Sequence, residues 1–85
     1  MVRKQGDWLS AMVGDELVMM SANTGNYVGL SEVGARIWEL IEEPRTVDSL
    51  CQSLTEEYDA EDAVVRPDVL AFLAKMQAEG AVKLS

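Results

Sequence analysis

The chain of 85 residues has no histidine and one cysteine, Cys51. Histidine is the side chain most often used in general acid–base catalysis, so the common catalytic arrangements lack their base. A single cysteine excludes an internal disulfide, and a soft-metal site needs more cysteine or histidine than the chain has. Cys51 also falls on an apolar helical stripe, where cysteine behaves as a small hydrophobic residue. We therefore expect no catalysis, no metal and no cofactor.

Basic residues are scarce: seven Lys and Arg stand against 15 Asp and Glu, which gives a net charge of −8. A surface of this sign repels phosphate backbones and suits a partner that carries basic residues. The last helical segment offers Lys75 between Asp68 and Glu79 rather than a basic stripe. Nucleic-acid binding is therefore not expected, even if the fold is one that often serves it.

The chain also lacks any apolar stretch near the roughly 20 residues that a membrane helix needs. The start, MVRKQGDW, is basic but has no apolar core of a signal peptide. The single cysteine fits a reducing compartment. These absences predict a cytoplasmic protein without a membrane partner, and the length predicts one domain over residues 1–85.

Three apolar runs separated by turn residues predict the first part of the fold. Gly14-Asp15 is a hairpin signal, because glycine supplies the positive φ that such turns need. The cluster NTGN forms a second turn. Consecutive strands with tight turns make an antiparallel meander, which must pack on another layer to be stable. The three runs are Trp8–Val13, Glu16–Ala22 and Tyr27–Leu30.

Helical signals follow the third run. Ser31 suits an N-cap, Pro44 marks the end of the first helix, and Thr46 caps the second. Gly34 lies inside the first helix, where glycine lowers helix stability by up to about 1 kcal/mol relative to Ala. Close approach of another backbone would explain why a glycine occupies this position. The apolar positions at helical spacing are Val33, Ile37, Trp38, Leu40 and Ile41 in the first helix, and Val47, Leu50, Cys51, Leu54 and Tyr58 in the second.

The acidic stretch EEYDAED, residues 56–62, predicts a connection to a third helix and lacks the spacing of a calcium loop. The third helix is expected to begin between Asp62 and Pro67, with Pro67 in its first turn. It ends at Glu79-Gly80, and a short extended tail covers Ala81–Leu84. The fold class is α+β and winged-helix-like, a three-stranded antiparallel sheet followed by three helices (βββααα). The apolar positions of the third helix are Val69, Leu70, Phe72, Leu73 and Met76.

A sheet of three strands leaves edges to which another strand can add. If Tyr27–Leu30 is an edge strand, main-chain hydrogen bonds would hold an extended peptide there. Apolar pockets from Val69, Phe72, Leu73 and Met76 would supply selectivity. An apolar stripe on a helix is normally part of a buried core, and periodicity does not show which of these residues line a groove instead.

The spaced residues Gly25, Tyr27, Leu30, Ser31 and Gly34, the run IWEL (37–40), and the later PRTV (44–47) together resemble the PqqD family of peptide-recognition proteins. The resemblance covers roughly Leu17–Val82. It implies non-catalytic binding of the leader segment of a ribosomally made precursor peptide, which adds as a strand to the third strand and packs against the third helix. The site residues that it implies are Asn26, Tyr27, Val28, Gly29, Leu30, Asp68, Val69, Phe72, Leu73 and Met76.

The sequence departs in two places from the members of the family that serve pyrroloquinoline quinone synthesis, and these differences indicate another subtype. Members from pyrroloquinoline quinone synthesis usually have Leu-Asn before the first helix and Cys-Asp-Gly after it, where this chain has Leu30-Ser31 and Ile41-Glu42-Glu43. The chain is more similar to leader-binding proteins of lasso-peptide pathways. The implied partners are then a leader-removing cysteine protease and a macrolactam-forming cyclase. A partner of a radical enzyme stays open as an alternative.

Other classes also stay open. A winged-helix transcription regulator would need a basic face, and a small enzyme or metal protein would need ligands or a base. Homodimerisation through the same edge strand is possible for any unguarded edge. Within the leading hypothesis, Asp68 pairs with a leader Lys or Arg. A Val28→Pro change abolishes binding if the Val28 N–H faces the guest.

Overall fold

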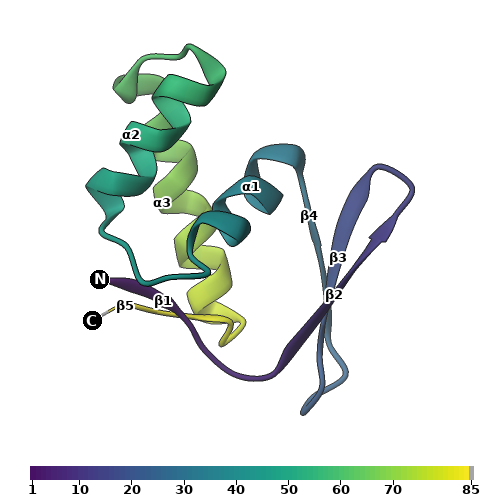
Figure 1. Ribbon diagram of the computed structural model, residues 1–85. Helices are drawn as coiled ribbons and strands as arrows, with labels where there is room; N and C mark the ends of the chain where they lie inside the picture. Colours follow the sequence, from purple (N-terminus) through teal and green to yellow (C-terminus); the bar gives the residue numbers. More distant parts are fainter. Residues whose placement is uncertain (85) are drawn as a thin grey trace.

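The computed structural model describes residues 1–84, which form five strands and three helices. The predicted order, a three-stranded antiparallel sheet followed by three helices, is confirmed. In Figure 1 this sheet stands beside the helices, with α1 nearest to it. The elements are β1 (Val2–Lys4), β2 (Trp8–Val13), β3 (Glu16–Ser21), β4 (Tyr27–Leu30), α1 (Glu32–Leu40), α2 (Val47–Tyr58), α3 (Asp62–Ala78) and β5 (Val82–Leu84).

The main sheet has the order β2-β3-β4, so β3 is central and β4 is an edge strand. β2 and β3 pair from Trp8↔Ser21 to Val13↔Glu16 across the two-residue turn Gly14-Asp15. Gly14 has a φ of +64° and Asp15 does not have a positive φ, the pattern of a type II′ hairpin turn. The turn signal in the sequence therefore defined both the hairpin and its register. β3 ends at Ser21, one residue before the predicted end.

A second, two-stranded sheet was not predicted as such. β1 pairs antiparallel with β5, and the backbone of Val2 also exchanges hydrogen bonds with Arg45 (N···O 2.6 and 3.0 Å). Val2 and Val82 are buried in the core. The expected extended tail is confirmed as β5, but β1 was missed, because three residues are too few to show periodicity. This sheet ties both ends of the described chain to the loop between α1 and α2 (Figure 1).

The two predicted caps are present. The Ser31 hydroxyl accepts a hydrogen bond from the Gly34 N–H at 3.2 Å, and the Thr46 hydroxyl accepts one from the Ser49 N–H at 3.1 Å. Each bond satisfies one of the backbone donors that a helix leaves unpaired at its start. The local sequence therefore defines where α1 and α2 begin.

Two expectations about α3 were wrong. The connection before it is not the whole acidic stretch 56–62: α2 continues to Tyr58, and Asp59 closes it in the left-handed conformation with φ 49°. α3 begins at Asp62, within the predicted range of Asp62–Pro67, but Pro67 then lies in its second turn rather than its first. Near this start, Arg66 forms ion pairs with Asp62 at 2.9 Å and with Asp48 of α2 at 3.0 Å. Burial of the Val65 side chain also stabilises the first turn of α3.

The hydrophobic core lies between the sheet and the helices. Met19, Val28 and Leu30 face it from the sheet, while alternate residues of the same strands face outward. α3 contributes a stripe at helical spacing, and α1 and α2 pack on either side of it. The buried helical residues are Ile37 and Trp38 of α1, Leu50, Cys51 and Leu54 of α2, and Val65, Val69, Leu73 and Met76 of α3.

Leu54→Ala is expected to lower the free energy of unfolding by about 2–5 kcal/mol, because it leaves a cavity beneath a fully buried side chain. Urea denaturation followed by circular dichroism measures this change. Leu70→Ala on the exposed side of α3 is the control and should change stability by no more than about 0.5 kcal/mol. A loss of stability in Leu70→Ala as large as that in Leu54→Ala would contradict the exposure of Leu70 on α3.

Candidate functional site

The outer edge of β4 is open: among residues 1–84, β3 is the strand that pairs with β4, and nothing pairs with its other side. The Ser21 N–H donates to the Asn26 carbonyl at 2.9 Å. Residues of an antiparallel ladder alternate between pairs that exchange both hydrogen bonds and pairs that exchange none. With the register Met19↔Val28 and Leu17↔Leu30, Val28 and Leu30 therefore direct their backbone groups to β3.

The same alternation leaves Tyr27 and Gly29 with backbone N–H and C=O groups directed to the open edge. The β2–β3 hairpin gives this result independently. Its two-residue turn closes at Val13↔Glu16, so Glu16 and every second residue after it bond to β2, and the residues between them bond to β4. The edge thus offers two donors and two acceptors at the spacing of an added strand.

The five predicted edge residues therefore differ in the direction of their backbone groups. Tyr27 and Gly29 face the open edge through their backbones, whereas the condition set for Val28, that its N–H faces a guest, is not met. The side chains of Val28 and Leu30 belong to the core. Asn26 lies in the preceding turn, where its N–H donates to the Thr24 hydroxyl at 3.3 Å.

The predicted residues of α3 also differ: some are buried in the core and others line a cavity. Val69, Leu73 and Met76 are fully buried core residues. Phe72 is half-buried and, together with Asp68, lines a cavity of about 360 Å³ between α1 and α3. Of the four apolar residues proposed for a pocket, Phe72 is thus the one that this cavity exposes. Sequence reasoning missed the other lining residues: Ser31, Val33, Gly34, Ile37 and Ala71.

Gly34 is the residue that shapes this cavity. A Cβ placed on it would lie 3.0 and 3.2 Å from two ring carbons of Phe72. The close approach that the helical glycine predicted is therefore made by an aromatic side chain, not by another backbone. Because glycine leaves room there, the Phe72 ring lies against α1 and forms one wall of the cavity.

The cavity adjoins both the open edge and a second hollow. Ser31 lines it and directly follows Leu30, so the cavity begins where β4 leads into α1. Val33 and Asp68 also line an apolar hollow of about 160 Å³ bounded by Leu54, Tyr58 and Val64 among others. The cavity and the hollow together form an apolar groove, and the Asp68 carboxylate lies where the two meet. An extended peptide on β4 would lie beside this groove.

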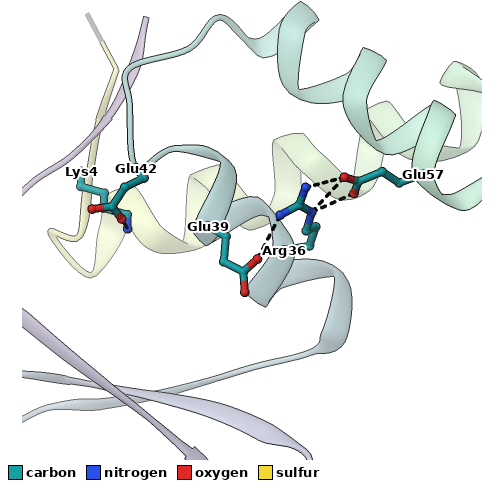
Figure 2. A network of polar contacts seen from close by, with 5 residues as sticks. All are labelled: Lys4, Arg36, Glu39, Glu42 and Glu57. Atoms are coloured by element: carbon teal, nitrogen blue, oxygen red, sulfur yellow. Dashed lines mark hydrogen bonds and ion pairs between the residues drawn. The ribbon is translucent and has the colours of Figure 1, made fainter.

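Ion pairs engage the basic residues nearest to this region (Figure 2). Arg36 of α1 binds Glu57 of α2 through Nε and Nη2 at 2.8 and 2.5 Å, and Glu39 through Nη1 at 3.0 Å. Glu57, and secondarily Glu39, raise the pKa of Arg36, and Arg36 lowers the pKa of Glu57. The pair joins α1 to α2 and leaves no free positive charge at that position.

Lys4 is engaged in a similar way. Its Nζ lies 2.5 Å from a carboxylate oxygen of Glu42 (Figure 2). The same Nζ lies 4.4 Å from the centre of the Trp38 ring. The bond to Lys4 lowers the pKa of the Glu42 carboxyl. Arg66 likewise forms ion pairs with Asp62 and Asp48. Several of the few basic side chains are therefore paired with carboxylates of the same protein. A nucleic-acid-binding face would need them on the surface and unpaired.

Cys51 is fully buried on α2 and unpaired. Burial raises the pKa of its thiol, the opposite of what a nucleophilic cysteine requires. No group of three or more His, Cys, Asp or Glu side chains within residues 1–84 is arranged to hold a metal ion. The chemistry offered by the described chain is therefore that of backbone hydrogen bonds, an apolar groove and an acidic border.

Because burial favours the protonated thiol, Cys51 should stabilise the folded protein less as pH rises. The pKa is higher in the folded state, so above about pH 8.5 the unfolded chain binds fewer protons and stability falls. The difference in free energy of unfolding between wild type and Cys51→Ala should therefore be constant below that pH and shrink from pH 8.5 to 10. A difference that grows over this range in urea denaturation would contradict the burial of the thiol.

The fold and its open edge beside an apolar groove define a winged-helix-like module suited to holding an extended peptide. Residues 16–82 match the family model of coenzyme PQQ synthesis protein D (PqqD). Because this match covers most of the chain, the protein belongs to the PqqD family. No curated protein sequence matches the chain.

Solved structures show the same fold. The structure of TbiB1 in complex with the TbiA(β) leader peptide is 29% identical, has a TM-score of 0.84, and aligns over 98% of this chain and 96% of the other. A lasso peptide synthetase B1 complexed with its leader peptide is 20% identical, with a TM-score of 0.82 and 98% of both chains covered. A PqqD truncation of Methylobacterium extorquens PqqCD, a stand-alone recognition element, is 19% identical, with a TM-score of 0.80 and 98% and 88% covered.

In residues 1–84, none of the helices combines the length and the apolar character that crossing a membrane would require.

Proposed function

We propose that the protein binds the leader segment of a ribosomally made precursor peptide by adding it as a strand to the open edge of β4. The observation that carries this proposal is the unpaired edge next to the cavity of α1 and α3. The similarity to TbiB1, which is known in complex with a leader peptide, supports it. In this role the protein presents the peptide and performs no chemistry itself.

Backbone and side chains contribute differently to such binding. Hydrogen bonds from Tyr27 and Gly29 hold any extended peptide, each with a net contribution of about 0.5–1.5 kcal/mol. Selectivity comes from the cavity, where an apolar guest side chain lies against Phe72 and Val33. Asp68 at its border favours a guest Lys or Arg, and the net charge of −8 attracts a basic peptide over a longer range.

The bound leader is then delivered to an enzyme that matures the precursor in the cytoplasm. We favour a lasso-type pathway with a leader-removing cysteine protease, because the sequence resembles the leader-binding proteins of such pathways and departs from the members of pyrroloquinoline quinone synthesis at Ser31 and at residues 41–43. The engagement of Lys4, Arg36 and Arg66 in ion pairs disfavours a transcription regulator.

Gly29→Pro should weaken leader binding by at least about tenfold while the protein stays folded. Proline removes an N–H that faces the open edge, and proline is tolerated at an edge where that N–H faces solvent. Calorimetric titration with a synthetic leader from the nearest encoded short peptide measures the affinity. Val28→Pro is the matched comparison: it removes a donor to β3 and should lower stability instead. Full affinity of a folded Gly29→Pro protein would exclude strand addition in this register.

Phe72→Ala should reduce leader affinity by about tenfold, roughly 1.4 kcal/mol, because the ring forms a wall of the cavity. Leu70→Ala lies on the exposed side of the same helix, lines none of the cavities described, and should bind like wild type. The same titration compares the two. Equal affinity of wild type and Phe72→Ala would show that the guest does not use this cavity.

A further inference from the structure

The outer face of the β2-β3-β4 sheet is apolar although nothing in residues 1–84 covers it. The helices pack on the other face, which carries Met19, Val28 and Leu30 (Figure 1). On the outer face Leu9, Val13 and Tyr27 are 61%, 64% and 71% exposed. The register brings the residues of this outer sheet face together across the three strands: Leu9, Ala11, Val13, Val18, Met20 and Tyr27.

Folding does not require these residues to be apolar. An antiparallel sheet with one face on the core and one in water normally alternates between apolar and polar residues. Here the strands read WLSAMV and ELVMMS, and the alternation is lost on the side away from the helices. The outer sheet face also borders a shallow hollow of about 340 Å³. A contiguous exposed apolar patch of this kind marks a surface that another molecule covers.

The charges around the outer sheet face indicate what covers it. Residues 5–35 contain no Lys or Arg. The acidic residues next to the face are Asp7, just before β2, Asp15 in the hairpin turn, and Glu16, which pairs with Val13. A second copy would bring two acidic borders together and would add to the repulsion between two chains of net charge −8. A protein with an apolar surface bordered by Lys and Arg is complementary in both respects.

We propose that the outer sheet face is the docking surface for the enzyme that processes the captured peptide, through an apolar patch with a basic border. This inference rests on the proposed function. Tyr27 belongs to both surfaces: its backbone faces the open edge of β4, and its side chain lies on the outer sheet face. A peptide added to β4 therefore extends the face that the enzyme contacts, so capture and delivery occur on adjacent surfaces.

The double variant Leu9→Lys/Val13→Lys tests the proposal. Both side chains are more than half exposed, so the protein should fold, and both lie away from the open edge of β4. The probes are a synthetic leader and the precursor from the nearest encoded short peptide, together with a leader-removing cysteine protease. Leader affinity should stay within about twofold of wild type, whereas the rate of precursor cleavage at limiting concentrations of both proteins should fall at least about tenfold.

Met12→Lys is the matched control, because Met12 lies in the same strand, is 64% exposed, and points to the opposite side of the sheet. Met12→Lys should support precursor cleavage by the protease at the wild-type rate, and an equal loss of cleavage with Met12→Lys would overturn the assignment to the outer sheet face. A wild-type rate of precursor cleavage in the presence of the double variant would also overturn it. So would a loss of leader binding in the double variant, or a wild-type dimer in sedimentation that the double variant dissociates.

The two proposals fail in different ways. If the wild-type protein does not bind the leader, the proposed function fails. If it binds the leader and the double variant supports cleavage fully, only the docking surface fails.

Discussion

The burial of one stripe of α3 organises the remaining elements. Val65, Val69, Leu73 and Met76 follow one another at three or four residues, which places them on one side of the helix. That side meets α2, α1 and β5, so α3 joins the small sheet to the other helices, and α1 in turn contacts β3 and β4 of the main sheet. Because the stripe is narrow, Asp68 and Phe72 fall at its margin and lie between core and solvent. The groove is thus a consequence of how α3 packs, with room added by Gly34.

Local signals predicted most of the fold because they act between neighbouring residues. The turn at Gly14-Asp15 and the caps at Ser31 and Thr46 all form as the sequence indicated. What could not be predicted depends on contacts between distant residues. β1 exists because it pairs with β5 at the other end of the chain. The place of Pro67 in the second turn of α3, next to the Arg66 that pairs with Asp48 of the preceding helix, was likewise not visible in the local sequence.

The candidate site was predictable in kind but not in detail. An edge strand follows from strand order, whereas the direction of each N–H follows from the register, which excludes Val28 and selects Tyr27 and Gly29. Phe72 and Leu73 are adjacent apolar residues on one helix, and periodicity alone assigns both to the core. Their roles differ because α1 offers the glycine at position 34 to one of them. The outer sheet face was hidden for a related reason: strands that are apolar on both sides do not reveal which side is covered.

The pairing of β1 with β5 has a consequence for how this module is combined with others. The two strands run antiparallel, so residues 2 and 84 lie opposite one another at the same end of the small sheet (Figure 1). That end carries neither the β4 edge nor the outer sheet face. A domain with adjoining ends of this kind can be joined to a larger protein at either end, or inserted into one of its loops, without moving its binding surfaces. The same unit is therefore geometrically suited to work as a separate chain or as part of a larger protein.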